Sequence, residues 1–140
     1  MTTRARCLLC ALVLAAGCSG PKESLVPVAG TVTVNKKLLA SGTVVFHPDA
    51  DKGNRDKREP RATIEADAPG AYRLMTDKQD GAPPGWYRVT IHALHATSSV
   101  RPPEWLADPK YAEEKTSGLT VEVRKDAPPG TYDFDLKPPG

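Results

Sequence analysis

Trp86-Tyr-Arg-Val-Thr-Ile-His-Ala-Leu94 is the clearest β-strand signal in this chain of 140 residues. Apolar side chains occupy every second position of the stretch: Tyr87, Val89, Ile91 and Ala93. In an extended backbone, successive side chains point to opposite sides, so these four share one face. The pattern predicts a strand with one buried face and one solvated face.

Six further segments show the same short, extended pattern between turns: residues 28–34, 43–47, 61–66, 71–76, 119–124 and 131–136. In the last two, apolar and polar residues alternate without exception. Asp67-Ala-Pro-Gly70 lies between residues 61–66 and 71–76, which predicts a hairpin there. Together the seven strands predict an all-β fold, a seven-stranded antiparallel Greek-key sandwich over residues 27–138.

Two connections between these strands are long. Residues 49–60 are charged and poor in apolar side chains, so they are predicted to form an exposed, solvated loop. The alternative is a loop that makes weak contact with anionic headgroups or cell-wall polymers. Residues 95–118 exceed the usual length of a connection. They carry Trp105, Leu106 and Tyr111, which are expected to cover an edge or mouth of the sandwich.

The N-terminus carries an export signal. Arg4 and Arg6 precede the apolar run 7–16, which ends in small residues at Gly17. The run is too short for a membrane-spanning helix and has the wrong flanks for one. Residues 1–17 are therefore predicted to be removed.

The Cys directly after Ala15-Ala-Gly17 makes this start similar to a bacterial lipoprotein signal, although Ala15 stands where that signature prefers Leu. The resemblance implies that Cys18 is lipidated and becomes the first mature residue, anchored in a lipid bilayer. Residues 18–26 would then be a tether, of which the eight residues after Cys18 span at most about 28 Å. The expected location is the cell envelope, either the outer membrane or the periplasmic face.

Composition excludes several functions. The chain has 19 Lys and Arg against 17 Asp and Glu, and removal of Arg4 and Arg6 balances the two. A neutral exported domain argues against nucleic-acid binding. All three cysteines lie at or before position 18, so the exported domain has neither a disulfide nor a thiolate metal site.

Several stretches together resemble the carboxypeptidase regulatory-like (transthyretin-like, prealbumin-like) domain, and small bacterial lipoproteins built from one such domain. The stretches are residues 28–34, 42–46, 66–72, 83–91, 109–111, 116–121 and 132–136. The resemblance implies a prealbumin-like sandwich without known catalysis. Asn35-Lys36 departs from the family pattern, which has Asp-Gly there, and a positive φ at Lys36 would cost about 1–2 kcal/mol. A turn wider than the family's is therefore expected.

The sequence offers no recognisable catalytic or cofactor motif, and no metal site is expected from His47, His92 and His95. A different class of function stays open: a hydrolase with an unfamiliar site near residues 95–118, joining His92 or His95 to Glu104 or Asp108. Another alternative is a subunit of a larger surface assembly that pairs through an exposed strand edge.

The favoured interpretation is a non-catalytic binding or structural module without a cofactor. Trp86, Trp105 and Tyr111 are candidates for contact with an envelope glycan or protein, because exposed aromatic rings offer flat apolar platforms.

Overall fold

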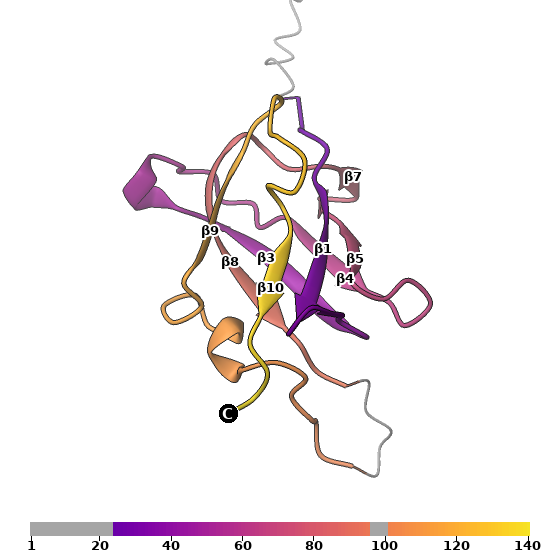
Figure 1. Ribbon diagram of the computed structural model, residues 1–140. Helices are drawn as coiled ribbons and strands as arrows, with labels where there is room; N and C mark the ends of the chain where they lie inside the picture. The colour runs from indigo at the N-terminus through magenta and orange to yellow at the C-terminus, as the bar shows by residue number, and fades with distance from the viewer. Residues whose placement is uncertain (1–23, 96–100) are drawn as a thin grey trace, which may run out of the picture.

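A computed structural model describes residues 24–95 and 101–140. Two β-sheets dominate it, and the only helical segments in these ranges are two single turns (Figure 1). The elements in chain order are β1 (Ala29–Val34), β2 (Lys37–Leu38), β3 (Gly42–Pro48), η1 (Ala50–Lys52), β4 (Arg61–Ile64), β5 (Ala71–Arg73), β6 (Met75–Thr76), β7 (Gln79–Asp80), β8 (Gly85–His92), η2 (Pro109–Ala112), β9 (Leu119–Val123) and β10 (Phe134–Leu136). The expected all-β class is confirmed.

The larger sheet has six strands in the order β7-β6-β4-β3-β8-β9, and every neighbouring pair is antiparallel. Its centre is the pair β3–β8, whose register runs from Thr43 opposite His92 to Pro48 opposite Tyr87. The stretch around Trp86–Leu94 thus forms a central strand, as its strong alternation predicts.

The smaller sheet is built around β1, which pairs with β10 on one side and with β2 and β5 along the other. β1 and β10 run parallel, with Val32 opposite Phe134, so a purely antiparallel arrangement is wrong for this pair. Alternation identifies which residues face the core, but carries no information on strand direction.

The predicted hairpin between residues 61–66 and 71–76 is only partly formed. The second segment is divided at Leu74, a fully buried residue. β5 pairs with β1 in the smaller sheet, whereas β6 pairs with β4 through Met75 and Arg61. The chain therefore crosses from one sheet to the other within a segment that sequence periodicity presents as one strand.

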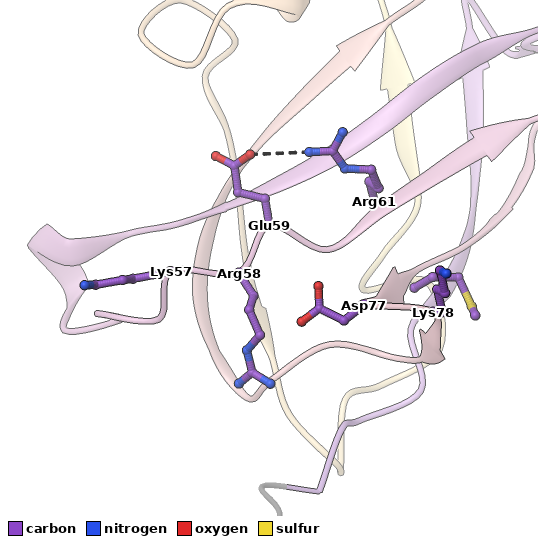
Figure 2. Close-up of a pocket in the computed structure, with 7 residues that line it drawn as sticks. Lys57, Arg58, Glu59, Arg61, Asp77 and Lys78 are labelled. Atoms are coloured by element: carbon purple, nitrogen blue, oxygen red, sulfur yellow. Dashed lines mark ion pairs between the residues drawn. The ribbon is translucent and has the colours of Figure 1, made fainter.

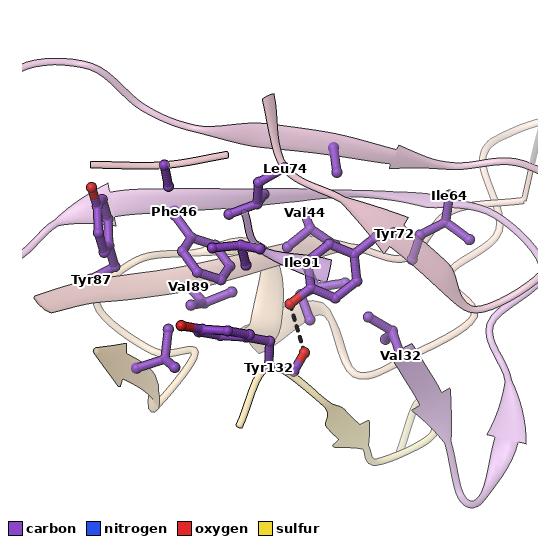
Figure 3. Packing of buried hydrophobic residues seen from close by; sticks show 14 of the residues in the cluster. Val32, Val44, Phe46, Ile64, Tyr72, Leu74, Tyr87, Val89, Ile91 and Tyr132 are labelled. Carbon is purple, nitrogen blue, oxygen red and sulfur yellow. Dashed lines mark hydrogen bonds between the residues drawn. The ribbon is translucent and has the colours of Figure 1, made fainter. Parts of the chain in front are cut away.

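The core lies between the two sheets (Figure 3). The inward faces predicted for residues 86–94, 119–124 and 131–136 are confirmed, since their apolar residues are buried or half-buried. Phe46 and Tyr87 pack with ring centroids 5.6 Å apart. Gly30 permits close contact between β1 and the turn that leads into β10, because a Cβ there would lie 2.1 Å from the Tyr132 carbonyl oxygen.

The turn after β1 is tight, so the expectation of a wider turn is wrong. Asn35 and Lys36 both have positive φ, 49° and 66°, and Val34 pairs directly with Lys37. Asp135 of β10 offsets the backbone cost at Lys36. Its Oδ1 accepts a hydrogen bond from the Lys36 amide at 3.0 Å, and its Oδ2 pairs with Lys36 Nζ at 2.7 Å.

The described part of the long loop, residues 101–118, packs on the body of the domain as expected. Leu94 and Trp105 form an isolated bridge, and the Leu106 amide donates to the carbonyl of Ala93. Tyr111, in η2, is buried. The described chain begins at the upper end of the sandwich in Figure 1, whereas η2 and the C-terminus lie at the lower end.

Candidate functional site

The outward face of the larger sheet carries a connected group of polar side chains. His47 of β3 and Thr90 of β8 point away from the core, because their neighbours Phe46, Val89 and Ile91 point into it. The His47 ring lies 2.9 Å from Thr90 Oγ1 through Nε2 and 2.9 Å from Glu59 Oε1 through Nδ1. Glu59 comes from the charged loop, residues 49–60, which the sequence predicts to be exposed.

The order hydroxyl–imidazole–carboxylate is the order of a hydrolytic triad. Thr90, however, is only 2 % exposed and lies within a central strand, so an incoming carbonyl carbon has no approach to its Oγ1. The nucleophile of such a site must reach its substrate. The geometry is therefore that of a hydrogen-bonded connection that ties the charged loop to β3 and β8.

Arg88 holds the other end of this loop. Its guanidinium lies 2.7 Å from Asp51, 3.4 Å from Asp49 and 3.7 Å from Glu114. Asp49, only 4 % exposed, also accepts a hydrogen bond from the Asp51 amide at the start of η1. The surrounding carboxylates, Asp49 foremost, raise the pKa of Arg88 above its usual value. These contacts fix η1 against the sheet.

A third charged contact lies within the loop itself. Asp56 accepts hydrogen bonds from the Arg58 side chain at 2.6 and 3.0 Å and from the Arg58 amide at 2.9 Å. These hydrogen bonds hold the pKa of the Asp56 carboxyl at about 2, below its usual 3.8. The loop between η1 and β4 is thus ordered by its own charges rather than by apolar burial.

An open groove of about 790 Å³ runs beside this loop (Figure 2). The lining residues are mainly charged: Lys57, Arg58, Glu59, Arg61, Met75, Asp77 and Lys78. One wall is the charged loop and the other is the β6–β7 hairpin, whose turn Asp77-Lys78 has positive φ at both residues. Arg61 pairs with Glu59 at 3.5 Å across the groove's upper edge in Figure 2.

The three candidate binding aromatics do not share one surface. Trp86 lies near the start of β8, whereas Trp105 bridges Leu94 beyond the other end of that strand. Eight residues of extended chain separate these positions by about 26 Å. Tyr111 is buried, and its hydroxyl accepts a hydrogen bond from the Lys137 amide at 3.3 Å. Trp86 remains half-buried, with Lys52 Nζ 4.1 Å from its ring centroid.

The residues proposed for a hydrolase near the long loop are engaged in other ways. His92 and His95 are exposed. The His95 amide donates to the Glu104 carbonyl at 2.9 Å, so this pair meets through the backbone. Asp108 accepts from the Lys110 amide at the start of η2. Within residues 24–95 and 101–140, no group of three His, Cys, Asp or Glu side chains could hold a metal ion.

Cys18, the predicted lipidation site, lies outside the described residues. In the part of the chain that the structure describes, no helix has the length and apolar character needed to cross a bilayer. Comparison with known proteins found no matching family model, no matching curated protein and no matching solved structure.

Sequence reasoning missed the contacts of Glu59, Thr90 and Arg88. Period-two alternation does place Arg88 and Thr90 on the polar face of β8, with His92. The missing information is the register, which sets His47 opposite Arg88 and brings the charged loop over them. No local signal in the sequence specifies this register.

Proposed function

We propose that this protein is an exported lipoprotein of the cell envelope. Its single β-sandwich would act as a non-catalytic binding or structural module, held at a bilayer through acylated Cys18. The observation that carries the proposal is the sequence Arg4 to Cys18: early positive charges, a short apolar run and a Cys directly after small residues.

The position of the domain is compatible with such an anchor. The first paired residue of the described chain, Val26, comes eight residues after Cys18 and forms a bridge with Ala82 at one end of the sandwich. A lipid-bearing Cys18 would keep that end within about 28 Å of the bilayer surface. The opposite end, with η2 and the C-terminus, would face away (Figure 1).

A non-catalytic role is supported by the state of the candidate groups. The hydroxyl–imidazole–carboxylate connection has a buried hydroxyl. His92 and His95 are exposed, and among the described residues their side chains form no hydrogen bond or ion pair with Glu104 or Asp108. We further propose that the sandwich is of the prealbumin-like, Greek-key type. Its seven main strands would be those longer than two residues, with β2, β6 and β7 as short extensions. The carboxypeptidase regulatory-like sequence pattern supports this assignment.

The experiment is a fractionation of cells that express the full chain. Cys18→Ser should move the protein from the membrane fraction to the soluble fraction and abolish fatty-acid labelling. Cys10→Ser is the matched control, because it removes a thiol from the predicted signal and should leave both unchanged. Retention of the Cys18→Ser variant in membranes, or equal labelling of both variants, would refute lipid anchoring.

A further inference from the structure

We propose that the end of the sandwich nearest to Cys18 binds the anionic headgroups of the bilayer that holds the protein. The surface consists of four cations, Lys52, Arg55, Lys57 and Lys78, beside Trp86. We refer to it as the basic shoulder. The orientation part of this proposal rests on the lipid anchor proposed above, whereas the affinity for anionic headgroups does not.

The cations of the basic shoulder lie in two depressions joined by one loop. Lys52 and Arg55 line the first together with Trp86 and Pro83. Lys57 and Lys78 line the groove of Figure 2. Asp56, which lines the first depression, directly precedes Lys57, so the two depressions are neighbours.

Both depressions adjoin the place where the described chain begins. Ala82, the residue before Pro83, exchanges backbone hydrogen bonds of 2.8 and 2.9 Å with Val26. Lys78 lies in the turn of the hairpin that leads directly into Ala82. Figure 1 shows β7 and the loop before β8 in the same upper part of the molecule as this start.

Charge pairing leaves these four cations available. The carboxylates of the loop are already engaged: Asp49 and Asp51 by Arg88, Asp56 by Arg58, and Glu59 by Arg61 and His47. By contrast, no carboxylate within the described ranges lies within 4.0 Å of Lys52, Arg55, Lys57 or Lys78. Asp77 is the one acidic lining residue of the groove outside these pairs.

The chemistry of the surface fits a bilayer better than a soluble anion. The groove is open and lies among flexible, exposed lysines, which suits a diffuse layer of negative charge. An anionic membrane attracts Lys and Arg side chains that lie near its surface. Each such residue raises the membrane partition coefficient roughly fivefold. Trp is enriched at the headgroup level, and Trp86 stands in contact with Lys52 on this surface. The short tether holds the surface within reach of the bilayer.

The two tryptophans provide the test, because they lie at opposite ends of β8. The full lipidated chain would be reconstituted in phosphatidylcholine vesicles with or without phosphatidylglycerol, with lipidation verified by mass. Quenching by brominated lipid would be measured for Trp105→Phe, which retains Trp86, and for Trp86→Phe, which retains Trp105. We expect quenching of Trp86 in the anionic vesicles alone, its loss at high salt, and no quenching of Trp105.

Charge-reversal variants distinguish the effect of the basic shoulder from the effect of the protein's net charge. At limiting anionic lipid, the double variant Lys57→Glu/Lys78→Glu should lower the fraction of chains whose Trp86 is quenched by more than tenfold. The matched control, Lys115→Glu with Lys137→Glu, alters the lower end of the molecule by the same charge and should have no effect.

Equal quenching of both tryptophans, quenching without anionic lipid, or an equal effect of the two double variants would overturn the proposal. Binding to a soluble anionic polysaccharide without binding to vesicles would overturn it as well. A chain that mass analysis finds unlipidated would refute the anchor alone. Sedimentation of that chain with phosphatidylglycerol vesicles, lost in Lys57→Glu/Lys78→Glu, would still support the basic shoulder, and its absence would overturn it.

Discussion

The two sheets of this sandwich are held together in different ways. The larger sheet has long ladders at its centre, where β3 shares six residue pairs with β8 and four with β4, and β8 shares five with β9. In the smaller sheet, β1 shares three pairs with β10, three with β5 and two with β2. A sheet with such short ladders needs additional contacts, and individual side chains supply them.

Three residues of the C-terminal segment provide these contacts in the smaller sheet. The Tyr132 carbonyl accepts a hydrogen bond of 2.6 Å from the Tyr72 hydroxyl. Asp133 accepts a bond of 2.8 Å from the Thr31 amide. Asp135 accepts from the Thr33 hydroxyl at 2.7 Å as well as from Lys36. The comparison indicates that single substitutions should affect the smaller sheet more strongly than the outward face of the larger one.

The largest effect is expected for Gly30→Ala. The added methyl group would lie 2.1 Å from the Tyr132 carbonyl oxygen, which is backbone and cannot rotate away. We expect a loss of about 3 kcal/mol or more in the free energy of unfolding, measured by urea denaturation. Thr63→Ala on the exposed face of β4 is the control in the larger sheet, with an expected change within about 1 kcal/mol. Equal losses in both variants would contradict the contrast between the sheets.

A smaller effect is expected for Tyr72→Phe. Removal of the hydroxyl leaves the buried Tyr132 carbonyl without this partner, at a cost of about 1–3 kcal/mol. The buried position also raises the pKa of Tyr72 well above its usual value, with the Asp133 charge adding to the shift, so its hydroxyl remains a donor at all ordinary pH.

Tyr132→Phe is the matched control for Tyr72→Phe. Its hydroxyl makes only long contacts with Arg124, 3.3 and 3.4 Å. We expect a loss below about 1 kcal/mol in the same urea measurement. A larger loss for Tyr132→Phe than for Tyr72→Phe would show that the inter-strand hydrogen bond is not what stabilises this region.

The smallest expected effect is a difference in stability between glycine substitutions in the two tight turns, one in each sheet. Lys36 and Lys78 both have positive φ, 66° and 68°, which glycine adopts without cost. Lys78→Gly should stabilise the protein by about 1 kcal/mol. Lys36→Gly should stabilise it less at neutral pH, because the substitution also removes the ion pair with Asp135. Thermal denaturation of both variants measures the difference.

The pH dependence of the two glycine variants tests the role of Asp135 in the turn at Lys36. Hydrogen bonds from Lys36 and Thr33 hold the pKa of Asp135 at about 2, below its usual 3.8. A depressed carboxyl pKa contributes stability above about pH 4, and this contribution is lost as the pH falls through 2. The stabilisation by Lys36→Gly should therefore grow as the pH approaches 2, whereas that by Lys78→Gly should stay constant. A parallel response of the two variants would exclude the role given to Asp135.

The sequence was informative where periodicity is local. Alternation in residues 86–94 and 119–124 identified the buried residues, because the face of a strand depends only on the order of its side chains. The parallel pairing of β1 with β10 and the crossing at Leu74 were not predictable in this way. They depend on contacts between residues far apart in the chain.

The same limit applies to the candidate site. His47 was recognised as a titratable residue, but its partners Glu59 and Thr90 lie 12 and 43 residues away. Composition predicts that the charged loop is exposed, but it does not reveal that Asp49 pairs with Arg88 or Asp56 with Arg58. The basic shoulder becomes apparent only after these pairs are assigned in three dimensions.

The parallel neighbours β1 and β10 join residues about a hundred positions apart in the chain, such as Val32 and Phe134. A chain that crosses a membrane unfolded, N-terminus first, would deliver β1 early and β10 last. The smaller sheet could then not close until export is complete, and high separation between contacting residues slows folding. If the chain is exported as proposed, one edge of β1 would stay unpaired until β10 arrives, and an envelope chaperone that covers such an edge would assist folding.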